Sequence, residues 1–184
     1  MISDSMQGNK PNIEVVPVAV VEKDILHHIA QSIMLHFGVS VTVKPSIPMP
    51  EAALRPHRNQ YEASVVLNAI GEQQSHGALK SLGVTGADLF GKGLNFVFGQ
   101  ARLGGCCGVI SLARLRLGTG GPAGRELFLR RIEKEAVHEL GHTFGLRHCP
   151  DPRCVMYYSN NIGDTDRKSA SFCTQCGVPQ VPVS

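Results

Sequence analysis

Residues 138–148 read His138-Glu139-Leu140-Gly141-His142-Thr143-Phe144-Gly145-Leu146-Arg147-His148. An apolar stripe at steps of four runs through and before this segment, formed by Phe128, Ile132, Ala136, Leu140 and Phe144. This periodicity predicts one amphipathic helix over residues 125–144. His138 and His142 are four positions apart and lie on a different face from the stripe, so their rings are one turn apart and can share one metal ion.

Gly145 and His148 extend this pattern beyond the helix. A glycine at a helix end permits the left-handed conformation that turns the chain, and the turn can bring His148 to the same ion. Three neutral imidazoles with one open position are typical of a catalytic zinc. Glu139 follows the first ligand and is the expected general base. The alternative, ordinary surface histidines on an amphipathic helix, is disfavoured by the added glycine and third histidine at fixed offsets.

Four cysteines follow the histidines in two pairs, Cys149 with Cys154 and Cys173 with Cys176. Two such pairs are typical of a closed, tetrahedral structural zinc site. Residues 149–184 hold too few large apolar side chains for a core of their own, and metal binding would supply that folding free energy. Disulfides and free buried thiols are the alternatives for the cysteines. His148 could also compete as a ligand of the second zinc, which would leave the first site only two histidines.

The motif at 138–148, Met156 eight residues later and the four cysteines together resemble the archaemetzincin family of the metzincin clan. The resemblance implies an α+β, zincin-like metzincin fold, in which a twisted mixed β-sheet is packed with helices that include the active-site helix. We expect residues 1–148 to form an N-terminal subdomain and residues 149–184 a small zinc-stapled C-terminal subdomain. Met156 would form the methionine turn under the catalytic zinc. Tyr158 is a candidate for transition-state support, although packing is at least as favoured for it and for Tyr157.

The resemblance also implies a cleft bordered by an antiparallel edge strand, to which an extended peptide could add. The best candidate for this strand is the run Leu94, Asn95, Phe96, Val97 and Phe98.

Apolar patterning predicts further strands at 13–21, 39–43, 82–90 and 109–117, and helices at 22–37 and 61–70. This alternation indicates a mixed sheet with packed helices.

Two adjacent cysteines, Cys106 and Cys107, lie outside the four-cysteine pattern. Neighbouring cysteines are poorly placed for a relaxed disulfide, so we interpret them as small buried hydrophobic residues. The alternative is that one of them lies near the cleft as a redox-sensitive inhibitor.

The composition narrows the class of protein further. The chain has 184 residues, 42% of them hydrophobic, and a net charge of +3 without a basic run, which disfavours nucleic acid as a partner. No apolar stretch is long enough for a membrane span. Residues 1–11 are expected to be an irregular lead-in, and residues 1–10 lack the pattern of a signal peptide, so a cytoplasmic monomer is expected.

The sequence therefore predicts a zinc-dependent peptidase with two zinc ions per chain, one catalytic and one structural, acting on a peptide or polypeptide. Endopeptidase and aminopeptidase activity are not distinguished. The first alternative is a catalytically weak or inactive two-zinc peptide-binding module, which the presence of Glu139 disfavours. The second is a structural zinc protein with an incidental helix motif, which Gly145 and His148 disfavour.

Overall fold

The computed structural model describes residues 11–181, so the predicted lead-in lies outside the described residues except for Pro11. A five-stranded sheet with the order β2-β1-β5-β8-β7 forms the centre of the fold. Its strands are β1 (Asn12–Val18), β2 (Ser40–Val43), β5 (Lys80–Thr85), β7 (Gly99–Ala101) and β8 (Cys107–Ser111). Strands β2, β1, β5 and β8 are parallel, whereas β7 pairs antiparallel with β8 and is the terminal strand.

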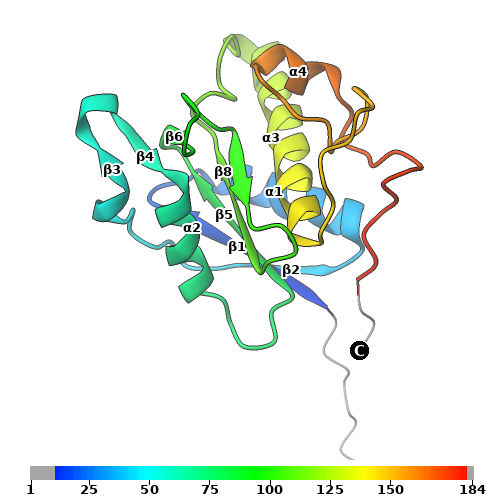
Figure 1. Cartoon of the computed structure of the whole chain (residues 1–184), viewed down its shortest axis with the longest axis horizontal. Coiled ribbons are helices and arrows are strands. Elements are labelled where there is room, and N and C mark those ends of the chain that lie inside the picture. The colour runs from blue at the N-terminus through cyan, green and yellow to red at the C-terminus, as the bar shows by residue number, and fades with distance from the viewer. Residues whose placement is uncertain (1–10, 182–184) are drawn as a thin grey trace, which may run out of the picture.

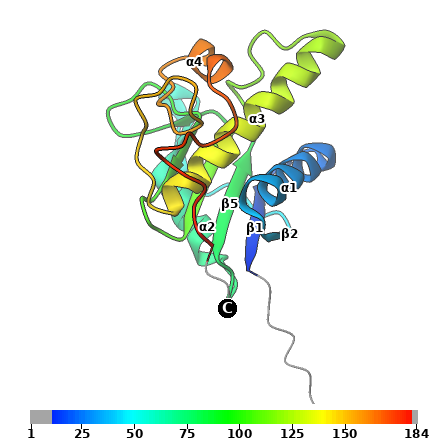
Figure 2. The same cartoon turned by 90° about the vertical axis from the view of Figure 1, so that its right-hand side faces the viewer.

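Helices cover both faces of this sheet. Helices α1 (Lys23–Phe37) and α3 (Gly121–Thr143) lie side by side over one face, and α2 (Ala63–Glu72) covers the other (Figures 1 and 2). Side chains of β1 divide accordingly, because Ile13 and Val15 belong to the apolar cluster with α1 and α3, whereas Val16 and Val18 pack with α2. The predicted α+β fold with a mixed sheet and packed helices is confirmed.

A second, small sheet has the order β3-β4-β6 and stands beside the main one. It contains β3 (Leu54–Arg55), β4 (Gln60–Glu62) and β6 (Leu89–Phe90), with 3-10 turns at Glu51–Ala53 and Pro56–Arg58. The strand predicted at 82–90 is therefore two strands in two sheets. The Thr85 hydroxyl accepts a hydrogen bond from the Ala87 amide (3.2 Å), and this local turn ends β5.

The predicted edge strand at 94–98 is wrong, because the antiparallel edge is β7, which begins at Gly99. Residues 94–98 form a loop with a single bridge, between Val97 and Leu89. The carbonyl of Asn95 accepts hydrogen bonds from the side chains of Arg58 (2.9 Å) and Gln60 (3.0 Å) instead of a strand partner. Side chains from the β3–β4 hairpin region thus satisfy backbone groups that a strand would have used.

Two further boundaries differ from prediction. Strand β8 ends at Ser111 rather than continuing to 117, because residues 113–118 form turns, with the Leu117 amide bonded to the Arg114 carbonyl (3.3 Å). Helix α3 begins at Gly121, four residues before the predicted start, with Pro122 in its first turn, where proline is tolerated. The ligand-bearing end of the helix falls where the apolar stripe predicts it.

Residues 149–181 wrap along α3 and contain one regular element, α4 (Ile162–Arg167) (Figure 2). Asn161 caps α4, since its side chain accepts from the Asp164 amide and its amide donates to the Asp164 carboxylate. The buried apolar side chains of this segment belong to the same apolar cluster as α3 and the sheet; they are Cys149, Cys154, Val155 and Met156. The division of the chain at residue 148 stays a prediction.

Charged side chains join α4 to α3. The guanidinium of Arg131, which is 4% exposed, makes two bonds of 2.7 and 2.8 Å to the Asp166 carboxylate. One turn later, Nζ of Lys168 lies 2.9 Å from Oε1 of Glu135, and both side chains are buried. The Lys134 ammonium, half-buried, donates to the Asp166 carbonyl (2.9 Å). The last segment is therefore fixed to the helix that carries the histidines.

The buried pair predicts a specific stability pattern. Lys168→Met should lower the free energy of unfolding by about 3–5 kcal/mol, because it leaves the Glu135 carboxylate buried without its cation. Adding Glu135→Gln should recover most of that loss. Lys134→Met, the matched control on a half-buried lysine, should cost about 1 kcal/mol. Urea titrations of the four proteins measure this, and equal losses for the two lysine variants would contradict the interpretation.

Candidate metal centres

The structure brings the three predicted histidines together at the C-terminal end of α3. Nε2 of His142 lies 3.1 Å from Nε2 of His138 and 3.2 Å from Nε2 of His148. A tetrahedral zinc with its usual bonds to nitrogen requires ligand atoms about 3.3 Å apart. These two separations are close to what a single zinc ion needs, and one ring nitrogen from each of the three histidines lies within 4.8 Å of the others.

Backbone carbonyls fix the orientation of two of these rings. Nδ1 of His138 lies 2.7 Å from the Val155 carbonyl oxygen, and Nδ1 of His142 lies 2.7 Å from the Leu146 carbonyl oxygen. Because a carbonyl only accepts, Nδ1 carries the proton in both rings, and the Nε2 lone pair is left free for a metal.

The third ring is brought back by the turn at Gly145, as the sequence predicts. Gly145 has a φ of 93°, a conformation that favours glycine, and its amide donates to the His142 carbonyl (2.9 Å). The chain then leads to His148, whose ring lies edge-on to Tyr158 with centroids 4.8 Å apart. The glycine therefore has a geometric role in forming the ligand set.

Burial keeps these imidazoles neutral. It lowers the pKa of His138 well below its usual value, and the nearby positive charge of Lys168 adds to this effect. Burial also lowers the pKa of His142 and of His148. At neutral pH the rings carry no additional proton that a metal would have to displace.

Glu139 is enclosed between α3 and the edge of the sheet. A Cβ added to Gly99 of β7 would lie 2.5 Å from its Oε1, and one added to Gly108 of β8 would lie 3.3 Å from its Cβ. Burial, and then the charge of Glu135, raise the pKa of Glu139 well above its usual value. Its Oε2 is buried and has no hydrogen-bond partner among residues 11–181. An orphaned carboxylate oxygen beside three convergent nitrogens fits a metal centre that also binds water.

Met156 packs directly against the helix between the first two histidines. It is fully buried, and a Cβ added to Gly141 would lie 2.5 Å from its Sδ. The amide of Cys149 donates to the Met156 carbonyl (3.0 Å), which closes the loop after His148. This position under the histidines is the one expected for a methionine turn.

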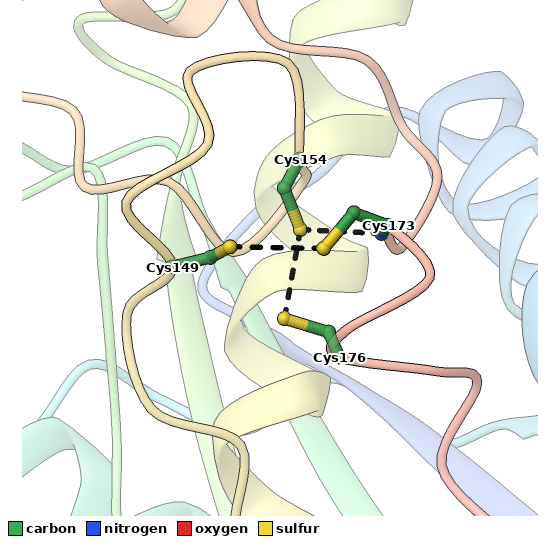
Figure 3. A group of neighbouring side chains, drawn as sticks. All are labelled: Cys149, Cys154, Cys173 and Cys176. Carbon is green, nitrogen blue, oxygen red and sulfur yellow. Dashed lines mark hydrogen bonds between the residues drawn. The ribbon is translucent and has the colours of Figure 1, made fainter.

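The four predicted cysteines converge on a second point, as Figure 3 shows. Sγ of Cys149 lies 3.7 Å from Sγ of Cys173, and Sγ of Cys154 lies 3.8 Å from Sγ of Cys176. A tetrahedral zinc–thiolate site requires sulfur atoms about 3.8 Å apart, and a disulfide about 2.05 Å. The Cys176 amide is the main reason that the pKa of the Cys173 thiol falls to about 7. The donor set fits structural zinc and excludes the disulfide alternative in this arrangement.

A cleft of about 570 Å³ opens over the histidines. Its lining includes Glu139, the three residues of β7 and the loop 94–98, so the run predicted as an edge strand borders the cleft without being a strand. Tyr158, which is 40% exposed, lies at the same cleft beside His148. Part of this side chain is therefore open to the cleft.

Cys106 and Cys107 lie on the other face of the sheet, toward α2. A Cβ added to Gly71 would be 3.4 Å from Sγ of Cys107 and 3.9 Å from Sγ of Cys106. Cys107 is buried in the apolar cluster with α2, and burial raises the pKa of its thiol to about 11. Neither thiol lines the cleft that the described residues form, so the inhibitor alternative has no geometric support.

Fold and site together define a zinc metalloprotease. Residues 20–179 match the profile of Peptidase family M54. The archaemetzincin of Pyrococcus furiosus is 43% identical over 171 residues, which cover 89% of each chain. The chain belongs to the archaemetzincin family, and the resemblance seen in the motif is confirmed.

Two solved structures agree with this assignment. The crystal structure of archaemetzincin from Methanopyrus kandleri superposes with a TM-score of 0.80 at 38% identity, covering 92% of this chain and 93% of that one. The archaemetzincin of Archaeoglobus fulgidus, complexed with malonate, superposes with a TM-score of 0.78 at 38% identity, covering 90% and 97%. Within residues 11–181, no helix is both long and apolar enough to cross a membrane.

The close approach of Met156 to Gly141 predicts that this glycine is required. Helix propensity alone would favour alanine by about 1 kcal/mol, but Gly141→Ala should lower the free energy of unfolding by about 1–3 kcal/mol because of the overlap with sulfur. Gly86→Ala is the control, since a Cβ there would meet nothing within 4 Å. Denaturant titrations compare the two, and a Gly141→Ala protein as stable as Gly86→Ala would contradict the packing argument.

Proposed function

We propose that this chain is a zinc-dependent peptidase in which His138, His142 and His148 hold the catalytic zinc and Glu139 is the general base. The single observation that carries the proposal is the enclosed, unpartnered Oε2 of Glu139 beside three convergent imidazole nitrogens. When bound, zinc lowers the pKa of water and polarises the scissile carbonyl.

Glu139 then has the environment that a general base requires. Its carboxylate takes a proton from water through the free oxygen and later gives the proton to the leaving amine. Burial raises its pKa, so it holds the proton between the two steps more readily than an exposed glutamate would. Gly99 and Gly108 allow β7 and β8 to approach the side chain and keep it in one position.

Strand β7 is the proposed platform for a peptide substrate. It is the terminal strand of the main sheet, and its residues line the cleft. An extended peptide can add to such an edge by main-chain hydrogen bonds. The loop with Leu94, Phe96 and Phe98 forms the adjacent rim. Tyr158, exposed beside His148, is the proposed donor to the oxygen that gains charge in the transition state.

The second proposed zinc is structural and is held by Cys149, Cys154, Cys173 and Cys176. Four thiolates close the coordination shell and leave no position for a substrate. Cys149 follows His148 directly, so a fixed thiolate at Cys149 restrains the third histidine. The proposal thus includes two zinc ions per chain and a C-terminal unit that begins at residue 149. Cleavage of free-amine against blocked peptides separates aminopeptidase from endopeptidase activity.

Substitution of the proposed base tests the function. Glu139→Gln should keep its zinc content and fold while hydrolysis falls by about 10²–10⁴-fold. Peptide-library digestion followed by mass spectrometry measures cleavage, and plasma mass spectrometry measures zinc. Glu126→Gln is the control, because Glu126 is on the same helix in an exposed pair with Arg130.

The outcomes separate the competing functions. Full activity in Glu139→Gln would remove Glu139 from the mechanism. A zinc-loaded wild-type protein that binds peptides and cleaves none would favour the inactive binding module instead.

A further inference from the structure

Two enclosed polar groups of the cleft have no part in the proposed hydrolysis. The hydroxyl oxygen of Ser159 is buried and makes no hydrogen bond to any described residue. Glu135, 3% exposed, uses Oε1 to accept from the Thr165 hydroxyl (3.2 Å) and to pair with Lys168 (2.9 Å). The hydrogen bond and the ion pair both use Oε1, and both Glu135 and Ser159 line the cleft.

Lys168 holds the segments that carry these groups next to each other. Its Nζ lies 2.9 Å from Glu135 and 3.5 Å from the carbonyl oxygen of Tyr157, two residues before Ser159. Glu135 also precedes Glu139 by four positions on α3, which is about 6 Å along the helix axis. Glu135 is therefore one helical turn from the proposed base, and Ser159 lines the same cleft.

The chemistry of the pair determines what this end of the cleft can recognise. A carboxylate oxygen only accepts hydrogen bonds, whereas a hydroxyl can donate one. Lys168 already balances the charge of Glu135, so a second cation here would be enclosed without a partner. A primary carboxamide has two N–H donors and one carbonyl acceptor and carries no charge, so it complements both groups.

We propose that Glu135 and Ser159 form a side-chain pocket that selects glutamine or asparagine next to the cleaved peptide bond. The amide NH₂ donates to Oε2 of Glu135, and the amide oxygen accepts from the Ser159 hydroxyl. Lys168 is a positioning residue, since it orients Glu135 and the segment after Met156. This inference rests on the proposed peptidase function and adds the class of substrate.

An apolar side chain in the pocket would leave the Ser159 hydroxyl without a partner and would offer no donor to Oε2 of Glu135, so its binding should be weaker. We therefore expect kcat/KM for a glutamine peptide to exceed that for its methionine analogue, of similar size, by about 10–100-fold. Peptides that also carry glutamate or lysine at that position complete the series. The whole peptide series is synthesised twice, once with the varied residue before the cleaved bond and once with it after the bond.

Variants assign the preference to the pocket. In Ser159→Ala the glutamine-to-methionine ratio should fall about tenfold, because one hydrogen bond is lost. In Ser64→Ala, the control for an exposed hydroxyl on α2, the ratio should equal that of the wild type. A ratio that Ser159→Ala leaves unchanged would overturn the proposal, as would a wild-type preference for lysine.

Binding gives an independent readout. Calorimetry on the Glu139→Gln protein with the same peptides should show about 10–100-fold tighter binding of glutamine than of methionine. Equal affinities and equal rates would overturn the pocket while leaving the peptidase function intact. Tighter glutamine binding without hydrolysis of any peptide by the wild type would instead support the pocket and refute the proposed function.

Discussion

The contact between the Val155 carbonyl oxygen and Nδ1 of His138, at 2.7 Å, joins the last segment of the chain to the helix that carries the histidines. It fixes the tautomer that leaves Nε2 free, and it brings Met156 against Gly141. The same segment continues to Tyr157, whose carbonyl faces Lys168. The packing of Met156 and the wall of the cleft both depend on the segment being held there.

Enclosed charge on one face of α3 distinguishes this helix from an ordinary amphipathic one. Glu135, His138 and Glu139 are each at most 5% exposed, and Lys168 is the cation buried with them. Burial lowers the pKa of His138 and raises that of Glu139. In the proposed hydrolysis, His138 would be a neutral ligand and Glu139 a base that holds a proton, and both directions are compatible with these roles. The cost of enclosing these groups is offset by the cation and by the contacts of α4.

The convergence of the three histidines could be predicted because their spacing is local: His138 and His142 are one turn apart, and a glycine turn returns His148. The edge strand was misplaced because the Asn95 carbonyl is occupied by side chains of Arg58 and Gln60, more than thirty positions away. The ion pair between Glu135 and Lys168 could not be predicted either, because its partners are also far apart in the sequence and neither local pattern indicates the pairing. The requirement for glycine at Gly99 and Gly108 could not be predicted, because it becomes visible only when the position of the Glu139 side chain against these strands is known.

We propose that the cysteine cluster supports the histidine site, and zinc titration of the Cys176→Ser protein measures this coupling. Wild type should bind two zinc ions and the variant one. Zinc affinity at the histidines should be about 10–100-fold weaker in the variant, because Cys149 adjoins His148 and the loop bearing Met156 loosens. Cys106→Ser, which lies outside both clusters, should keep both ions at wild-type affinity. An unchanged affinity at the histidines, with the cysteine-bound zinc demonstrably lost, would show that the two sites are independent.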